Sequence, residues 1–216
     1  MFSSPVGAVP KPHFMGLRLI TDQSTGPHAL NSFIPRGAAA VQYDNMHDFG
    51  KLLRKIHFQY GQPLAYLFKS DYSEAFRRIP MHVLWQIRQI VTVDGARHID
   101  RCLCSFMALV WIAISIKCIN GLLHYMDDAF GFEMDPDLDF NEPYNKYYPK
   151  KQVVLLRLWD ELNLPHNVKK QEFGTSLTII GFHVDPLCMS LSIPLFAREE
   201  LVTAIQLFLG TSASCR

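Results

Sequence analysis

The chain has 216 residues, of which 49% are hydrophobic and 19% charged, and its formal net charge is +1. This length allows one sizeable domain or a domain with part of another, and the composition excludes a largely disordered chain. The charge is unevenly spread, because residues 132–148 hold five acidic residues and one lysine, a balance of 1 − 5 = −4, which leaves +5 elsewhere. We expect the acidic stretch to be a solvated loop and the remainder to be compatible with phosphate contacts.

The five cysteines show no paired C-x-x-C spacing. Their odd number and their spacing argue against a disulfide framework and favour a reducing, intracellular compartment, cytoplasmic or nuclear. Residues 1–10 lack the basic start and apolar centre of a signal sequence, so we expect a protein that is not secreted. The apolar run 103–116 is shorter than the ~20 residues of a membrane span. It predicts a buried helix, with a membrane anchor as the alternative.

The first part of the chain predicts short strands and one amphipathic helix. Prolines keep residues 5–12 extended, residues 17–22 alternate as a strand does, and residues 23–35 have the composition of a loop. Residues 44–60 predict a helix, because apolar side chains recur there at helical spacing. Residues 64–70 predict an apolar strand that delivers Asp71 at its end.

The second part predicts two hairpins, a turn between half-strands and three helices. Asp94-Gly95 between 86–93 and 96–101 is a strong hairpin signal, and the helix over 103–117 follows. Half-strands at 121–125 and 129–132 flank a turn, and a helix covers 151–162. A late hairpin is expected from 178–184 and 188–193, and a last helix over 198–209 stops at Gly210. This mixture without βαβ regularity predicts an α+β fold with an antiparallel sheet.

The turn between the two half-strands carries adjacent carboxylates in the run Tyr125-Met126-Asp127-Asp128. Like charges at this range repel, so two such carboxylates at a hairpin tip favour a bound cation. Ligands that are all oxygen suit Mg²⁺, which takes one or two carboxylates together with substrate phosphates. The alternative is an Asp-Asp turn without function, and an isolated pair would favour it.

A further candidate is Asp71, at the end of the strand predicted over 64–70. Small residues follow it, and an aromatic ring, Phe76, stands five positions on. A nucleotide pocket would use the carboxylate as a metal ligand, the small residues to admit a triphosphate, and the ring to pack against the sugar. The alternative is an Asp at a turn, with Phe76 in the core.

These blocks together resemble the motifs of reverse transcriptases. Asp71 with Ala75-Phe76 resembles motif A, and the run 125–128 resembles motif C. Lys11 and the block at 18–22 resemble the fingers segment, 164–170 resembles motif D, and 180–183 resembles the primer-grip hairpin. The match spans nearly the whole chain in collinear order. The sequences of these motifs, with Lys-Lys-Gln-Glu-Phe-Gly at 169–174, most resemble those of DIRS-type, tyrosine-recombinase retroelements, a kind of retrotransposon.

The resemblance implies an RNA-directed DNA polymerase that uses two Mg²⁺ ions, with Mn²⁺ as a possible substitute, on a template-primer and dNTP. It also implies a polymerase palm-like antiparallel sheet with packed helices plus partial fingers. We expect a fingers-like segment at 1–70, a palm-like core at 71–195 and the start of a thumb at 196–216. The metal ligands would be Asp71, Asp127 and Asp128. The other implied residues are Lys11 and Arg18 for the phosphates, Phe76 against the ribose 2′-hydroxyl, Tyr125 and Met126 at the substrate, and Lys170 to protonate pyrophosphate.

The sequence departs from the family between motifs A and C. Motif B, a Gly-containing turn followed by Ser/Ala-Pro and an aromatic residue, is missing from 94–106. Asp71 also stands only 127 − 71 = 56 residues before Asp127. We also expect a truncated thumb. Two hypotheses from different classes follow. Either the chain is a polymerase domain, or it is a catalytically inactive palm remnant that at most binds nucleic acid or a protein. For Lys170, a solvated lysine near a helix end is an equal alternative to the catalytic role.

Overall fold

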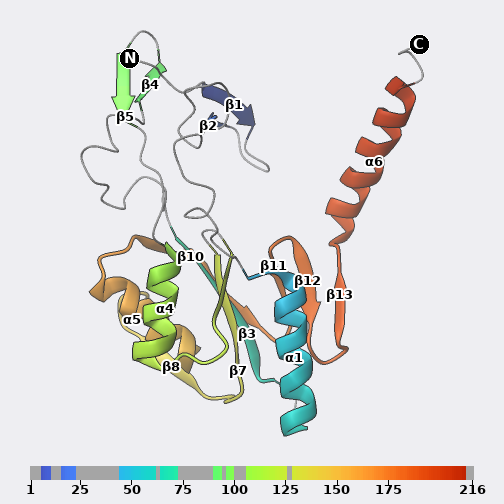
Figure 1. Cartoon of the computed structure of the whole chain (residues 1–216). Helices are drawn as coiled ribbons and strands as arrows, with labels where there is room; N and C mark the ends of the chain where they lie inside the picture. The colour runs from blue at the N-terminus through green and yellow to red at the C-terminus, as the bar shows by residue number, and fades with distance from the viewer. Residues whose placement is uncertain are drawn as a thin grey trace, which may run out of the picture. The chain divides into compact units, whose positions relative to one another are not determined.

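A computed structural model of the chain describes residues 6–10, 16–22, 44–61, 64–72, 90–93, 96–99, 106–125 and 128–212 (Figure 1). The chain forms two compact units. Unit 1 contains residues 1–42 and 73–107, and unit 2 contains residues 43–72 and 108–216. Each unit is therefore assembled from segments that are distant in sequence.

Unit 1 contains two short antiparallel hairpins. Strand β1 (Val6–Pro10) pairs with β2 (Leu17–Thr21), and Arg18 lies opposite Val9. Strand β4 (Ile90–Val93) pairs with β5 (Ala96–Ile99), with Val93 opposite Ala96. The hairpin predicted around Asp94-Gly95 is confirmed by this pairing, although those two residues lie outside the described ones.

Unit 2 is organised around a four-stranded antiparallel sheet. Its strands lie in the order β10 (His166–Gly174), β3 (Tyr66–Tyr72), β7 (Asp128–Glu133) and β6 (Leu123–Tyr125). Strand β3 is an inner strand with neighbours on both sides, and Leu67, Phe68 and Ser70 on it are fully buried. The apolar run predicted as a strand therefore forms the middle of the sheet.

Helices cover both faces of this sheet. Helix α1 (Met46–Tyr60) lies on one side, and α4 (Phe106–Lys117) and α5 (Lys150–Glu161) lie on the other (Figure 1). Helix α1 starts at Asn45, whose side-chain oxygen accepts the amide protons of His47 and Asp48 at 2.9 and 3.1 Å. It ends at Gly61, whose φ of 62° is the left-handed conformation that glycine adopts without cost.

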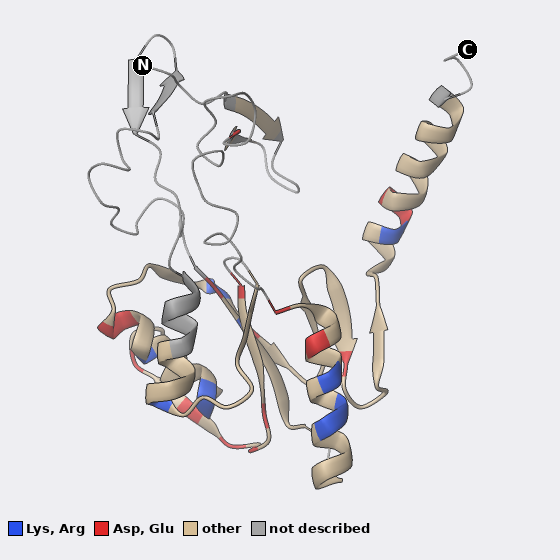
Figure 2. Ribbon diagram, in the orientation of Figure 1, with Lys and Arg blue, Asp and Glu red and all other residues tan. Residues whose placement is uncertain are grey.

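The two flanks of α1 differ in character. Its apolar stripe of Phe49, Leu53 and Ile56 is buried against the sheet. Three basic residues occupy exposed positions of the same helix, and Figure 2 colours the ribbon blue at the Lys and Arg residues of the helix. They are Lys51, Arg54 and Lys55. The helix predicted over 44–60 is therefore confirmed, with the apolar face where the spacing placed it.

The acidic stretch is not a loop throughout, contrary to our expectation. Strands β8 (Leu138–Asn141) and β9 (Lys146–Pro149) form an antiparallel hairpin within it. Tyr148 and Asn141 are buried, and the Asn141 side chain accepts the amide proton of Tyr144 in the turn at 3.1 Å. Buried side chains thus hold a hairpin within a stretch that is rich in acidic residues.

The late hairpin is also different, because a three-stranded sheet replaces it. Strands β11 (Leu177–Ile179), β12 (Phe182–Asp185) and β13 (Ser190–Ser192) pair antiparallel in that order. The strand predicted over 178–184 is broken at Ile180 and Gly181, whose φ values of 48° and 78° reverse the chain. The turn after Asp185 lies where it was predicted.

Helix α6 (Leu195–Ser212) follows β13 directly and is longer than the helix predicted over 198–209. Within the described residues, no helix is both long and apolar enough to cross a membrane. Ala113 in α4 is fully buried. The described part of the apolar run thus forms a helix, and its residues from Ala108 onward belong to unit 2.

Candidate active site at the end of the central sheet

Two carboxylates face each other where β3 and β7 meet the end of the sheet. Asp71 lies directly opposite Asp128 in the antiparallel register. Directly opposed residues of such a pair project from the same face, with Cβ atoms roughly 4.5–5.5 Å apart. The pattern extends to β6, where Tyr125 lies opposite Asp128. Tyr125, Asp128 and Asp71 therefore form one cross-strand row, here named the carboxylate row.

The rows beneath the carboxylate row show which face it occupies. Phe130 lies opposite Lys69 and Phe132 opposite Leu67, with the same parity as Asp128 and Asp71. Phe130, Phe132 and Leu67 belong to the core cluster that α1 closes with Phe49 and Leu53. The carboxylate row therefore continues the α1 face of the sheet beyond its apolar core.

The fourth strand brings a cation to this row. The Nζ atom of Lys170 on β10 lies 2.8 Å from Oδ2 of Asp71, with both side chains partly exposed. The register of β10 against β3 shifts between His166 and Gln171, so several β10 residues face a single stretch of β3. This irregularity places Lys170 beside Asp71. The sequence named both residues for the site, and the structure brings them together.

Helix α5 fixes the strand that carries Asp71 from the other face. The indole N–H of Trp159 donates to the Ser70 hydroxyl at 3.3 Å, and the Gln152 amide donates to the Lys69 carbonyl at 3.1 Å. Trp159, Gln152 and Ser70 are fully buried. Because Ser70 faces α5, the alternation of β3 turns Asp71 to the opposite face. Sequence reasoning missed these supports, since nothing local to 152 or 159 indicates a partner on β3.

The start of β10 is held by a chain of polar side chains. Nε2 of His166 lies 2.8 Å from Oδ1 of Asp160, and the Tyr144 hydroxyl contacts Nδ1 of His166. Burial raises the pKa of Tyr144 to about 12, with the Asp160 carboxylate and Tyr148 adding to the effect. A protonated Tyr144 donates to Nδ1, which leaves Nε2–H of His166 to donate to Asp160. These hydrogen bonds connect the β8–β9 turn and the end of α5 to the strand that carries Lys170.

A second support holds the hairpin of β6 and β7. The Asp44 carboxylate accepts the His124 amide proton at 2.8 Å, and the Asp44 amide donates to the His124 carbonyl at 3.1 Å. Burial raises the pKa of Asp44, against the effect of the His124 hydrogen bond. The segment that leads into α1 is thereby joined to β6 one residue before Tyr125.

The remaining residues proposed from the sequence are distributed as follows. Arg18 lies on β2 in unit 1, where its backbone pairs with Val9. Four others lie outside the described residues: Lys11, Phe76, Met126 and Asp127. The described part of the candidate site is therefore Asp71, Tyr125, Asp128 and Lys170.

The described residues of this row include carboxylates, whose oxygens are suitable ligands for a divalent ion. They are too few to surround such an ion. Across the described parts of the chain, no group of three or more His, Cys, Asp or Glu side chains is arranged to hold a metal ion. Asp71 and Asp128 supply hard oxygen donors on one face, which is the donor type of Mg²⁺. The ammonium of Lys170 supplies the positive charge beside Asp71.

Comparison with known proteins shows the fold. No family model matches the sequence, and no curated protein matches it significantly. The foamy viral protease-reverse transcriptase in complex with an RNA/DNA hybrid has a TM-score of 0.62 and 19% identity, over 96% of this chain and 27% of that one. The same protein in complex with double-stranded DNA gives 0.60 and 18%, over 99% and 43%.

A third foamy viral structure, of the dRH form with double-stranded DNA, gives a TM-score of 0.57 and 18% identity over 89% of this chain and 31% of that one. This chain thus spans less than half of the viral chains it resembles. Its mixed architecture of antiparallel sheets, with four helices among the described residues, agrees with the fold class predicted from the sequence. The chain has the fold of reverse-transcriptase palm and fingers domains.

Proposed function

We propose that this chain acts in RNA-directed DNA synthesis, transferring a nucleotide to a primer 3′-hydroxyl. The observation that carries the proposal is the opposition of Asp71 and Asp128 at the end of a sheet with the reverse-transcriptase fold. Carboxylate oxygens on one face of a sheet end are the donor type that binds the Mg²⁺ of a nucleotide. RNA or DNA template-primer and dNTP are the partners under this proposal.

The metal set in this proposal is Asp71 and Asp127 as main ligands, with Asp128 in support. When bound, two Mg²⁺ ions would lower the pKa of the 3′-hydroxyl and offset charge on the leaving pyrophosphate. Lys11 and Arg18 would bind the triphosphate by charge-assisted hydrogen bonds, and Phe76 would exclude the ribose 2′-hydroxyl. Tyr125 and Met126 would line the substrate side of the hairpin. The division into fingers-like 1–70, palm-like 71–195 and thumb-like 196–216 belongs to the same proposal.

Lys170 has a defined task in this arrangement. Its ammonium lies 2.8 Å from the carboxylate of Asp71, one of the proposed metal ligands. We assign it the role of general acid toward the leaving pyrophosphate. The DIRS-type retrotransposon affiliation and an intracellular location also remain proposals. The affiliation rests on the sequences of the motifs. The location rests on the cysteines, of which Cys118 and Cys188 are free thiols.

Primer extension on an RNA template with Mg²⁺ and with Mn²⁺ tests the function. Wild type should extend the primer, and Asp71→Asn and Asp127→Asn should each abolish extension without unfolding the protein. The matched control is Asp139→Asn, which replaces an acidic residue on the β8–β9 hairpin and should leave extension unchanged. Extension that survives Asp71→Asn would contradict the proposed site.

A second function is favoured by one observation, the absence between 94 and 106 of the motif B turn, which in the family is followed by Ser/Ala-Pro and an aromatic residue. Templated addition depends on holding two reactants in near-attack geometry, worth roughly 7–11 kcal/mol, and that turn supports the template base in the family. Calorimetric titration with Mg²⁺ or Mn²⁺ separates the two functions. Metal binding that Asp127→Asn removes, without any extension, would identify a palm that retains its metal ligands but is not a polymerase. No metal signal in either assay would identify an inert remnant.

Phe76 provides a test of the substrate side. Its replacement by a smaller residue should relax discrimination between dNTP and rNTP, because the ring would no longer meet the 2′-hydroxyl. An equal loss with both nucleotides, together with a lower melting temperature, would show that Phe76 belongs to the core.

A further inference from the structure

A row of apolar side chains on the small sheet stops at an open edge. Leu177 on β11 lies opposite Val184 on β12, and Val184 lies opposite Leu191 on β13. Along this row the exposed fraction rises from 9% at Leu177 and 3% at Val184 to 51% at Leu191. In the described part of the chain, β13 is the last strand of its sheet. The row therefore ends with a large apolar side chain half covered.

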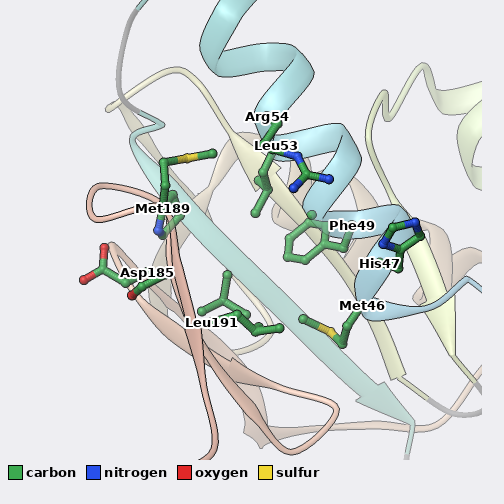
Figure 3. A pocket seen from close by; sticks show the side chains of 12 residues that line it. Met46, His47, Phe49, Leu53, Arg54, Asp185, Met189 and Leu191 are labelled. Carbon is green, nitrogen blue, oxygen red and sulfur yellow. The ribbon is translucent and has the colours of Figure 1, made fainter.

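A cavity of about 400 Å³ borders this row, with Val184 and Leu191 among its lining residues. It is bounded by α1 on one side and by the β12–β13 hairpin on the other, and we name it the α1–β13 pocket. Figure 3 shows Phe49, Leu53 and Leu191 around it, with Met46 and Met189 at its borders. Methionine side chains are flexible and adapt to the shape of an incoming apolar group.

The rim of the pocket carries basic residues on one side and an acidic residue on the other. His47 and Arg54 line the α1 side, and both are exposed. On the hairpin side, the Asp185 carboxylate accepts the amide protons of Leu187 and Cys188 at 2.9 and 3.1 Å. The Asp185 carboxylate is therefore oriented by its own turn, and Arg54 is exposed on the α1 side of the pocket.

We propose that this edge is a docking site for an extended acidic peptide segment of a partner protein, which adds a fourth strand beside β13. A strand added there would lie about 4.8 Å from β13, and its residue opposite Leu191 would project from the same face into the α1–β13 pocket. Main-chain hydrogen bonds to β13 supply affinity in this mode of recognition, and the pocket selects an apolar side chain. Acidic residues on either side of that anchor meet Arg54 and His47.

Charge decides between a partner peptide and a second copy of this chain. Pairing of β13 with β13 of another copy would continue the sheet, but it would also bring two α1 helices together. Each carries Lys51, Arg54 and Lys55 on exposed positions, so like charges would meet. An acidic segment meets the same side chains with opposite charge. The site is separate from the carboxylate row and does not depend on the proposed polymerase function.

Fluorescence anisotropy with the full chain and labelled seven-residue peptides tests this proposal. The peptides alternate threonine with either glutamate or lysine around one central valine, leucine, phenylalanine or tryptophan. We expect binding of the glutamate series with an apolar centre. Leu191→Asp should weaken it at least about tenfold, because a charge would enter the apolar row. The matched control is Leu187→Asp, in the same hairpin but outside the pocket lining, which should change the affinity little.

Two further arms identify the mode of binding. Arg54→Glu should reverse the preference from the glutamate to the lysine series, whereas Lys55→Glu, on the neighbouring position outside the pocket, should not. N-methylation of alternate peptide amides should abolish binding, because it removes the main-chain donors that pair with β13. Failure of every peptide to bind, or binding that N-methylation and Leu191→Asp leave unchanged, would overturn the proposal. A dimer detected by light scattering that Leu191→Asp dissociates would overturn it in favour of a second copy.

Discussion

The two sheets of unit 2 end in different ways. In the central sheet the row Tyr125–Asp128–Asp71 is polar, and Lys170 on the next strand stands against its last carboxylate. In the small sheet the row Leu177–Val184–Leu191 is apolar and ends at the α1–β13 pocket. A polar row at the end of a sheet offers charge to a ligand, whereas an apolar row at an edge offers surface to another strand. The same cross-strand geometry thus supports two kinds of site.

The largest expected effect concerns the backbone beneath the carboxylate row. Gly121 has a φ of 82°, and a Cβ added there would lie 2.2 Å from the ring of Phe132. Left-handed backbone and overpacking together should make Gly121→Ala cost about 2–5 kcal/mol of unfolding free energy. Denaturant unfolding measures this loss.

Gly50→Ala is the matched control for this substitution. Gly50 lies within α1, and a Cβ there would meet nothing within 4 Å. Alanine should stabilise the helix by roughly 0.5–1 kcal/mol relative to glycine. Equal effects of the two substitutions would show that the β6–β7 hairpin does not depend on the close approach at Gly121.

The second prediction compares positions within the apolar row itself. Val184→Ala should cost about 1–3 kcal/mol, because Val184 is buried in the core cluster and its methyl groups would leave a cavity. Leu191→Ala should cost less than about 1 kcal/mol despite removing more carbon, because half of that side chain already faces solvent. If Leu191→Ala proved the more destabilising, the edge would already be covered in solution, and the row would not be open.

Some of this architecture was predictable because its signals are local. Asp71 and Asp128 interrupt apolar strands, and a polar residue at the end of such a strand is visible within a few residues of sequence. The helix over 44–60 followed from its spacing. The approach of Lys170 to Asp71 could not be read in this way, since it depends on the register shift between His166 and Gln171. The resemblance to a known motif, rather than any physical pattern, singled out that lysine.

The errors have equally specific causes. The β8–β9 hairpin was taken for a loop because it lies in the stretch 132–148 with its five acidic residues. The buried Tyr148 and Asn141 that hold it give no strong alternation. The break at Ile180 was missed because a β-branched residue seldom adopts a positive φ, so the sequence favoured an unbroken strand. The apolar row also escaped prediction, since residues 177, 184 and 191 become neighbours only through two successive turns.

The third prediction removes the cation at the end of the carboxylate row. Lys170→Met should change stability by less than about 1 kcal/mol, because the ion pair with Asp71 is partly exposed. It should nevertheless raise the affinity for Mn²⁺ a few-fold, since the ammonium no longer competes for the carboxylate. Calorimetric titration measures both proteins, and Lys169→Met is the adjacent control. An unchanged or weaker affinity would mean that Lys170 does not compete with a cation at Asp71.

The smallest effect is confined to alkaline pH and tests the chain Tyr144–His166–Asp160, which fixes the strand of Lys170. Burial raises the pKa of Tyr144 from 10.0 to about 12. The unfolded chain therefore releases this proton at lower pH than the folded protein. The contribution of Tyr144 to stability is complete below pH 10 and is lost as the pH rises toward 12.

Wild type should lose unfolding free energy across that window, and Tyr144→Phe should lose less. Unfolding curves at pH 8, 10 and 11 measure the difference, with Tyr147→Phe on the exposed side of the β8–β9 hairpin as control. Parallel losses in wild type and Tyr144→Phe would show that the Tyr144 hydroxyl reaches solvent and does not hold His166.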